Sequence, residues 1–169
     1  MSIDLITLSF ALSVLAVILS IFAFQRSHQK LEQQTSEEKH FESTPLQLQA
    51  YERLVLLTER IALAELINRL YQPGYSAMEM KQLLLDNIRQ EFSYNTSQQL
   101  YVSQLAWDAV RNLKEQEIML INQVYSLITP TDPATAFTKK ILETEMAQTE
   151  GSLRDLVTQV LNREAKKIM

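Results

Sequence analysis

An uncharged run near the amino terminus constrains this chain more than any other feature. Residues 5–24 contain no charged side chain, and Arg26 follows after a single glutamine. About 20 helical residues rise roughly 30 Å, which matches the hydrocarbon core of a bilayer. We therefore expect residues 1–25 to form one N-terminal transmembrane helix that contacts the lipid bilayer through residues 5–24.

A cleaved secretory signal is the alternative interpretation of this run. Such a signal begins with basic residues, has a shorter apolar core and ends at a small-x-small cleavage site. Here Asp4 is the only charged side chain before the run, and its exit, residues 20–24, is bulky. These departures favour an uncleaved anchor.

The charges that flank the run predict its orientation. No Lys or Arg precedes it, whereas Arg26, Lys30 and Lys39 follow it. Because basic residues favour the cytoplasmic side, we expect the N-terminus outside and the C-terminal domain in the cytoplasm.

Two further parts follow the anchor. Residues 26–44 are polar, with Leu31 and Phe41 as the only bulky apolar side chains. They can form a flexible tether or a helical stalk of about 30 Å, and the sequence leaves both open. Residues 45–169 have the length of one small domain with a single core.

The first helix of this domain has clear start and stop signals. Thr44 is a suitable N-cap, Pro45 suits the first helical position, and Gln47 can reach back to the cap. Pro73 and Gly74 predict its end near residue 71. The apolar positions between these points cover more than one face, so this helix needs neighbours on two sides.

Capping signals predict the remaining helices. Capping boxes at residues 76–79 and 96–99 open the next two, and the second extends about 30 residues to Ile128. Asp132 as the cap and Pro133 just inside predict another helix, and a break at Gly151 precedes an amphipathic last segment. No segment of the domain shows sustained strand alternation. The fold class is therefore all-α, a four- to five-helix bundle at residues 45–169.

The composition speaks against familiar chemistry. The chain has no cysteine, two glycines and two histidines, His28 and His40, both in the tether. The sequence therefore contains neither a glycine-rich phosphate-binding loop nor the Glu-x-x-His motif of a helical di-metal site. A formal net charge of −4 without a basic stripe speaks against nucleic acid as a partner. We expect no cofactor, no metal and no catalytic residue.

Acidic residues of the second half invite a different interpretation. They alternate with lysines, which predicts a solvated face rather than a carboxylate cluster. Glu117 fits this least well, because it lies between apolar turns. The residues concerned are Glu115, Glu117, Glu143, Glu145 and Glu150.

Polar and aromatic residues gather around one predicted helix junction. They can form a network that satisfies the helix ends, or a recognition patch, in which Tyr and Arg are enriched. The candidate residues are Arg53, Arg89, Glu91, Tyr94, Asn95, Gln98, Gln99 and Tyr101. An unfamiliar enzyme site around Arg53, Arg60, Arg89 and Glu91 is a less favoured hypothesis, because a convergent pocket is its usual sign.

Several strings of the chain resemble a known family. They are residues 45–54, Glu91-Phe92, Asn95, residues 97–103 and Trp107. They are similar to an uncharacterised family of membrane-anchored helical proteins of Bacteroidetes, and the likeness weakens after Thr129. The resemblance implies a bacterial inner-membrane location and supplies no site residue.

The favoured function is that of a single-pass inner-membrane protein whose cytoplasmic helical domain serves as an adaptor or scaffold. Its expected partner is another protein or a second copy of the chain. The alternative is an accessory subunit of a larger membrane complex, in which the small residues Ser9, Ala11, Ser13 and Ala16 let the spanning helix pack on partners. The amphipathic last helix can close the bundle, contact a partner or lie on the membrane.

Overall fold

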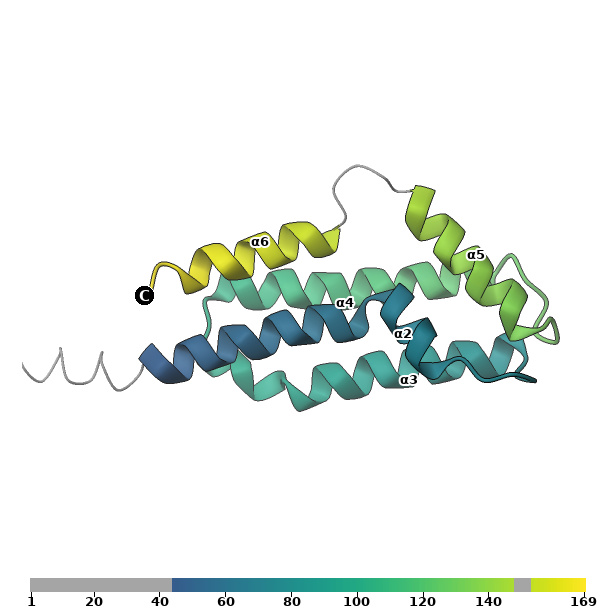
Figure 1. The fold of residues 1–169 in the computed structure, drawn as a ribbon, viewed down its shortest axis with the longest axis horizontal. Coiled ribbons are helices and arrows are strands. Elements are labelled where there is room, and N and C mark those ends of the chain that lie inside the picture. Colours follow the sequence, from purple (N-terminus) through teal and green to yellow (C-terminus); the bar gives the residue numbers. More distant parts are fainter. Residues whose placement is uncertain (1–43, 148–152) are drawn as a thin grey trace, which may run out of the picture. The chain divides into compact units, whose positions relative to one another are not determined.

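The computed structural model describes residues 44–147 and 153–169 (Figure 1). This part of the chain is helical, and its only β-type pairing is an isolated bridge between Ser76 and Pro133. The predicted anchor and nearly all of the predicted tether lie outside the described residues. None of the described helices combines the length and the apolar character needed to cross a membrane.

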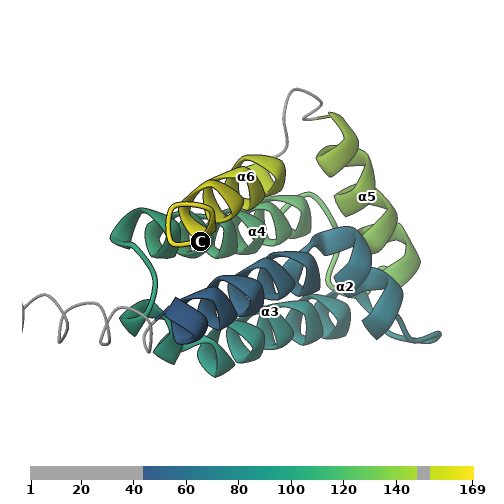
Figure 2. The same ribbon diagram turned by 60° about the vertical axis from the view of Figure 1, so that its left-hand side comes forward.

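Five α-helices follow an initial helical segment, residues 44–61. They are α2 (Leu63–Leu70), α3 (Ala77–Tyr94), α4 (Gln104–Tyr125), α5 (Ala134–Ala147) and α6 (Leu153–Ala165), with a short 3-10 helix, η1 (Thr96–Leu100), between α3 and α4. The segment 44–61, α3, α4 and α6 run along the long axis of the bundle, while α5 lies across one end (Figures 1 and 2). The all-α prediction is confirmed for the described residues.

The predicted first helix is in fact two helices. Ala62 leaves the helical conformation, with φ −57° and ψ 128°, so the chain turns between residues 61 and 63. Ile61 and Leu63 on the two sides of this turn are both fully buried. The wide apolar stripe therefore comes from two successive helices with different buried faces. Thr44, the predicted cap, is already helical.

Of the capping boxes predicted at residues 76–79 and 96–99, the first forms. The Ser76 hydroxyl accepts from the N–H of Glu79, and the Glu79 carboxylate accepts from the N–H of Ser76, as the prediction requires. The box predicted at residues 96–99 is wrong as a start of the long helix, because Thr96 opens η1 instead. The long helix α4 begins at Gln104 with Ser103 as its N-cap and has 22 residues.

The first turns of α3 and α5 are joined through their backbones. The N–H of Ala77 donates to the carbonyl of Asp132 at 2.7 Å, and the N–H of Ala134 donates to the carbonyl of Tyr75 at 2.8 Å. The Asp132 side chain accepts from the N–H of Thr129, so it closes the turn before α5. Pro133 lies just before α5 rather than inside it. Each helix start thus satisfies a donor of the other.

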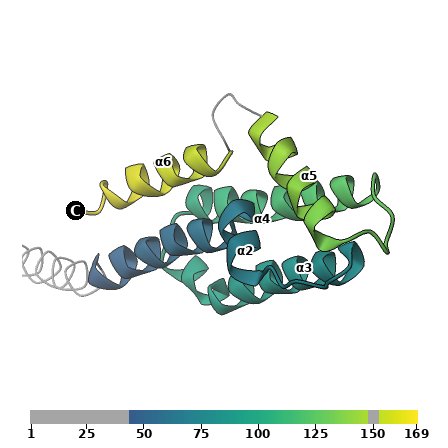
Figure 3. The ribbon, with the colours of Figure 1, turned by 45° about the vertical axis from the view of Figure 1, so that its right-hand side comes forward.

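A single core runs through the described helices. Leu57 lies in the first segment, Met80 and Leu84 in α3, Ile121 in α4 and Phe137 in α5, all with almost no exposed surface. The last helix, α6, packs against α4 with Val157 and Leu161 buried (Figure 3). Of the three open possibilities for this helix, closure of the bundle is the one observed.

Candidate functional site

Glu91 is the centre of the predicted polar junction. It lies on α3, and its side chain is only 12% exposed. The Arg60 guanidinium donates to both carboxylate oxygens, with Nε to Oε2 at 2.8 Å. Arg69 of α2 adds a longer contact, 3.7 Å from Nη2 to Oε1. One carboxylate therefore holds two arginines, one on each side of the break at Ala62.

Arg69 also contacts the end of the first helical segment. Its Nη2 donates to the backbone carbonyl of Arg60 at 3.3 Å. Carbonyls in the last turn of a helix lack partners within that helix, so Arg69 supplies one here. The hydrogen bond to Glu91 raises the pKa of Arg60 above its usual value. The arrangement fixes the turn between residues 61 and 63 and leaves the carboxylate engaged.

The arginines predicted to accompany Glu91 lie elsewhere. Arg53 is exposed, and Arg89 pairs with Asp86 of its own helix at 3.5 Å. The structure therefore does not bring Arg53, Arg89 and Glu91 into one cleft. Arg60 and Arg69 were missed as a pair because Ala62, which has no turn signal in the sequence, redirects α2.

The other predicted residues separate into helix-end contacts and exposed side chains. Asn95 donates from Nδ2 to the carbonyl of Glu91 at 2.9 Å, and Gln98 is buried and donates to the Ser97 hydroxyl. Tyr94, Gln99 and Tyr101 are exposed. Glu91, Asn95 and Gln98 thus make contacts within the bundle, whereas Tyr94 accepts a hydrogen bond from Gln90 of its own helix at 2.8 Å and both tyrosine side chains are exposed.

A second junction joins three segments at the start of α4. The hydroxyl of Tyr51 accepts from the N–H of Ser103 at 3.0 Å, and the Ser103 hydroxyl accepts from the N–H of Ala106. Two hydrogen bonds lower the pKa of Glu164 on α6, the larger effect coming from Lys167 and the smaller from the Ser103 side chain. The roles of Tyr51 and Glu164 here were not predicted, because Ser103, which contacts both, is 52 residues from Tyr51 and 61 residues from Glu164 in the chain.

Two half-buried carboxyl groups, on α4 and α5, interact electrostatically with each other and with an arginine of α6. Burial raises the pKa of Glu117 on α4 to about 8, and Glu145 on α5 adds to the shift while Arg154 on α6 opposes it. Burial also raises the pKa of Glu145. The predicted solvated face is therefore wrong for these two residues. The sequence indicated this burial at Glu117, which lies between apolar turns of its helix.

This pair is not a metal site in the part of the chain that the structure covers. No three acidic or histidine side chains among residues 44–147 and 153–169 lie close enough to hold an ion. With a pKa near 8, Glu117 is mostly protonated at neutral pH. It therefore acts as a neutral polar group between α4, α5 and α6.

An open concave surface lies between α2 and α5. This groove, which we call the α2–α5 groove, has a volume of about 550 Å³. Ile67, Tyr71, Leu142 and Met146 supply its apolar surface. Its other lining residues are Asn68, Thr135, Thr138, Lys139 and Glu143. Met146 is 77% exposed, which leaves a large apolar side chain at the rim.

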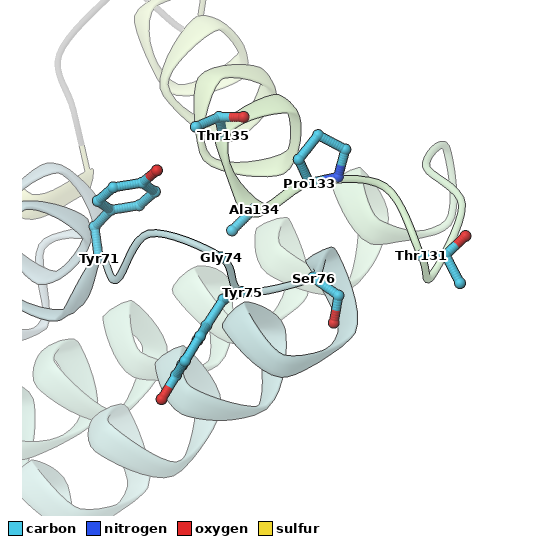
Figure 4. A pocket seen from close by; sticks show the side chains of 8 residues that line it. All are labelled: Tyr71, Gly74, Tyr75, Ser76, Thr131, Pro133, Ala134 and Thr135. Carbon is cyan, nitrogen blue, oxygen red and sulfur yellow. The ribbon is translucent and has the colours of Figure 1, made fainter.

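A second hollow of about 320 Å³ adjoins the groove and shares Tyr71 and Thr135 with it. Figure 4 shows Tyr71 and Thr135 on opposite sides of this hollow, above the turn at Gly74. Gly74 has φ +90°, a conformation that favours glycine, and it lets the chain turn sharply between α2 and α3. Together the two hollows follow the length of α5.

The chemistry of this lining suits binding better than catalysis. The Thr138 hydroxyl donates to the carbonyl of Ala134 at 2.9 Å, so it is engaged within its own helix. Lys139 and Glu143 lie 3.9 Å apart on the exposed side. Ser76, which lines the smaller hollow, donates from its hydroxyl to Glu79 at 2.7 Å within the capping box of α3, so this hydroxyl is engaged as well.

Comparisons with known proteins give a family without a function. A model described as a family of unknown function, DUF7935, matches residues 1–168. No curated protein and no solved structure matches the chain. The expected uncharacterised family is confirmed, and the match continues well past Thr129. Membrane anchoring stays a prediction.

Proposed function

We propose that this chain, which belongs to the DUF7935 family of unknown function, is a single-pass inner-membrane protein with a cytoplasmic helical domain that binds another protein. The α2–α5 groove is the observation that carries the binding part of this proposal. It is open, lined by apolar side chains and free of an arrangement that suggests catalysis among its described residues.

An amphipathic helix of the partner is the ligand that this groove fits. Grooves between helices bind such helices through apolar residues repeated at three- and four-residue steps. Ile67, Leu142 and Met146 form the apolar strip, and Lys139 and Glu143 at the rim supply charges of both signs. Tyr71, 38% exposed, is the aromatic contact of the kind enriched at interfaces.

The uncharged run of residues 5–24 supports the membrane part of the proposal. Its length matches a bilayer, and the three basic residues that follow it predict a cytoplasmic domain. A partner in the cytoplasm would thereby be held at the membrane surface. The role proposed for the protein is therefore that of a membrane-tethered adaptor.

Affinity purification of the full-length protein from its native membrane tests this proposal. Mild detergent extraction, mass spectrometry and the mass of the intact particle identify any stoichiometric partner. Met146→Glu places a charge in the groove without disturbing the core, because this side chain is exposed. Met119→Glu, at an exposed position of α4, is the matched control.

We expect the wild type and the Met119→Glu variant to retain one partner that the Met146→Glu variant loses. Retention by all three proteins would contradict binding in the groove. A partner retained by all three but lost on substitution of Ser9, Ala11, Ser13 or Ala16 would instead identify an accessory subunit that packs through its spanning helix. A homo-oligomer without another protein would contradict the adaptor role.

A further inference from the structure

One end of the bundle carries an unusual share of the exposed apolar side chains. The start of the segment 44–61, the chain between α3 and α4, and the carboxyl terminus meet at this end (Figures 1 and 3). We call it the entry end, because the described chain begins there. Its exposed large apolar residues are Leu46, Tyr94, Leu100, Tyr101, Leu105 and Met169. The opposite end, with the turns before α3 and α5, exposes Tyr71, Met78 and Leu127 of this kind, about half as many as the entry end among the described residues.

The chain segments that carry most of these exposed apolar residues contain no charged side chains. Residues 43–51 and 92–107 contain no acidic or basic side chain. Tyr94 and Leu100 are 69% and 76% exposed. Trp107, in contrast, is 7% exposed, and its ring packs on that of Phe92 with the ring centroids 5.1 Å apart. Exposed leucines and tyrosines without charges among them are costly in water but are typical of the interface between lipid and water.

Basic residues flank this apolar surface. Arg163, Lys166 and Lys167 are exposed in the last turns of the chain. The acid beside them, Glu164, is buried and paired with Lys167. Lysines beside an apolar surface attract the anionic headgroups of a cytoplasmic leaflet.

We propose that the entry end docks on the surface of the bilayer, with Tyr94, Leu100, Tyr101 and Leu105 in the interfacial layer and Lys166 and Lys167 against anionic headgroups. This inference rests on the proposed membrane anchor. It assigns the entry end a lipid surface, whereas the α2–α5 groove, which begins at the opposite end, faces the cytoplasm and stays open to a protein partner.

The length of chain before residue 44 supports a lipid occupant. Nineteen residues, 25–43, separate the uncharged run from the described domain. Even a fully extended chain of this length spans no more than about 65 Å, so the length alone keeps the domain near the bilayer that the uncharged run is proposed to cross. Tethering gives a high effective concentration at the surface, so a weak affinity of the domain for lipid is sufficient for docking.

Single-cysteine labelling of the full-length protein tests the proposal directly, because the chain has no cysteine. Leu100→Cys and Leu105→Cys place a nitroxide at the entry end, and Leu127→Cys places one at the opposite end. The labelled proteins are reconstituted into vesicles of phosphatidylcholine with or without phosphatidylglycerol. The accessibility of each nitroxide to oxygen and to a water-soluble nickel complex is then measured.

We expect the nitroxides at positions 100 and 105 to favour oxygen over nickel, as in lipid, and the nitroxide at position 127 to favour nickel. Lys166→Gln should lower the ratio of docked to undocked domain about fivefold in anionic vesicles and leave it unchanged in neutral ones. Equal nickel accessibility at positions 100 and 127 would overturn the proposal. Shielding from nickel without a gain in oxygen, or dipolar coupling between labels, would also overturn it in favour of a protein partner or a second copy.

Carbonate extraction of the same vesicles separates this inference from the anchor itself. A protein that resists extraction but shows no lipid contact at position 100 keeps its anchor and loses only the docking surface. A protein that carbonate releases refutes the anchor.

Discussion

Glu91 shows how one side chain can hold a turn that has no turn residues. Its carboxylate engages Arg60 and Arg69 on the two sides of Ala62. Glu91→Ala should lower the free energy of unfolding by about 1–3 kcal/mol, because hydrogen bonds to a charged group are lost and two arginines lose their partner. Denaturant unfolding of the detergent-solubilised chain measures this change.

Asp86→Ala is the matched control for that substitution. Asp86 pairs with Arg89 on the same helix, but both side chains are more than half exposed. Surface pairs of this kind contribute little, so the change should stay within about 0.5 kcal/mol. Equal losses for the two variants would show that Glu91 does not hold the turn.

Glu117 makes the stability of the protein depend on pH. Its pKa is about 8 in the folded protein, well above the ordinary value of 4.5. The folded state therefore holds a proton that the unfolded state releases, so the stabilising contribution of this group is complete below pH 4.5 and is lost as the pH rises toward 8. Partial exposure of the side chain reduces the effect to an order of 2–3 kcal/mol.

Glu117→Gln should remove most of this dependence. A neutral amide has no proton to lose, so the variant should be more stable than the wild type at pH 8 and similar to it at pH 5. Thermal unfolding across this pH range measures the difference. Glu115→Gln, at an exposed neighbouring position, is the control and should follow the wild type. An unchanged slope in Glu117→Gln would contradict the shifted pKa.

At the scale of the element, a local capping signal predicted a helix start correctly where residues before it end the preceding helix, and incorrectly where no such residues are present. Ser76 and Glu79 form the predicted box, because a proline and a glycine before them exclude a continuing helix. Thr96 has no such breaker before it, and its hydroxyl donates to the carbonyl of Phe92 in the preceding helix. Ser103, which caps α4, is selected by its contact with Tyr51, a partner that local patterns do not reveal.

Ser103→Ala should therefore cost more than Thr96→Ala. Loss of an N-cap costs about 1 kcal/mol, and the Ser103 hydroxyl also contacts Glu164. Thr96→Ala should stay within about 0.5 kcal/mol, since its hydroxyl is exposed. Helicity and denaturation midpoints of the two full-length variants distinguish them, and the reverse order would restore Thr96 as the start of the long helix.

At the scale of the whole molecule, apolar periodicity predicted the fold class and most of the core, because a helix buries one face whatever its partners are. Apolar periodicity did not predict how the helices are placed relative to one another. The break at Ala62 places Arg69 beside Glu91, and the backbone pairing of residues 75–77 with residues 132–134 places α5 beside α2 and so creates the groove. Neither event has a local signature.

Topology of the whole chain is open to a direct test. Protease added to inverted membrane vesicles should remove the domain, whereas right-side-out vesicles should protect it, because the basic residues after the uncharged run favour the cytoplasmic side. Immunodetection of a carboxyl-terminal tag measures protection, and solubilised vesicles provide the control for protease access. Digestion of the tag from right-side-out vesicles would reverse the proposed orientation.

The packing of Trp107 gives the protein a built-in optical reporter. It is the only tryptophan of the chain, it is 7% exposed, and its ring lies on Phe92 where α3 and α4 meet. Emission excited at the red edge of the protein band therefore comes from this one corner of the molecule. A change in its colour or lifetime during unfolding or lipid addition reports on the entry end alone, and no foreign dye is needed to follow it.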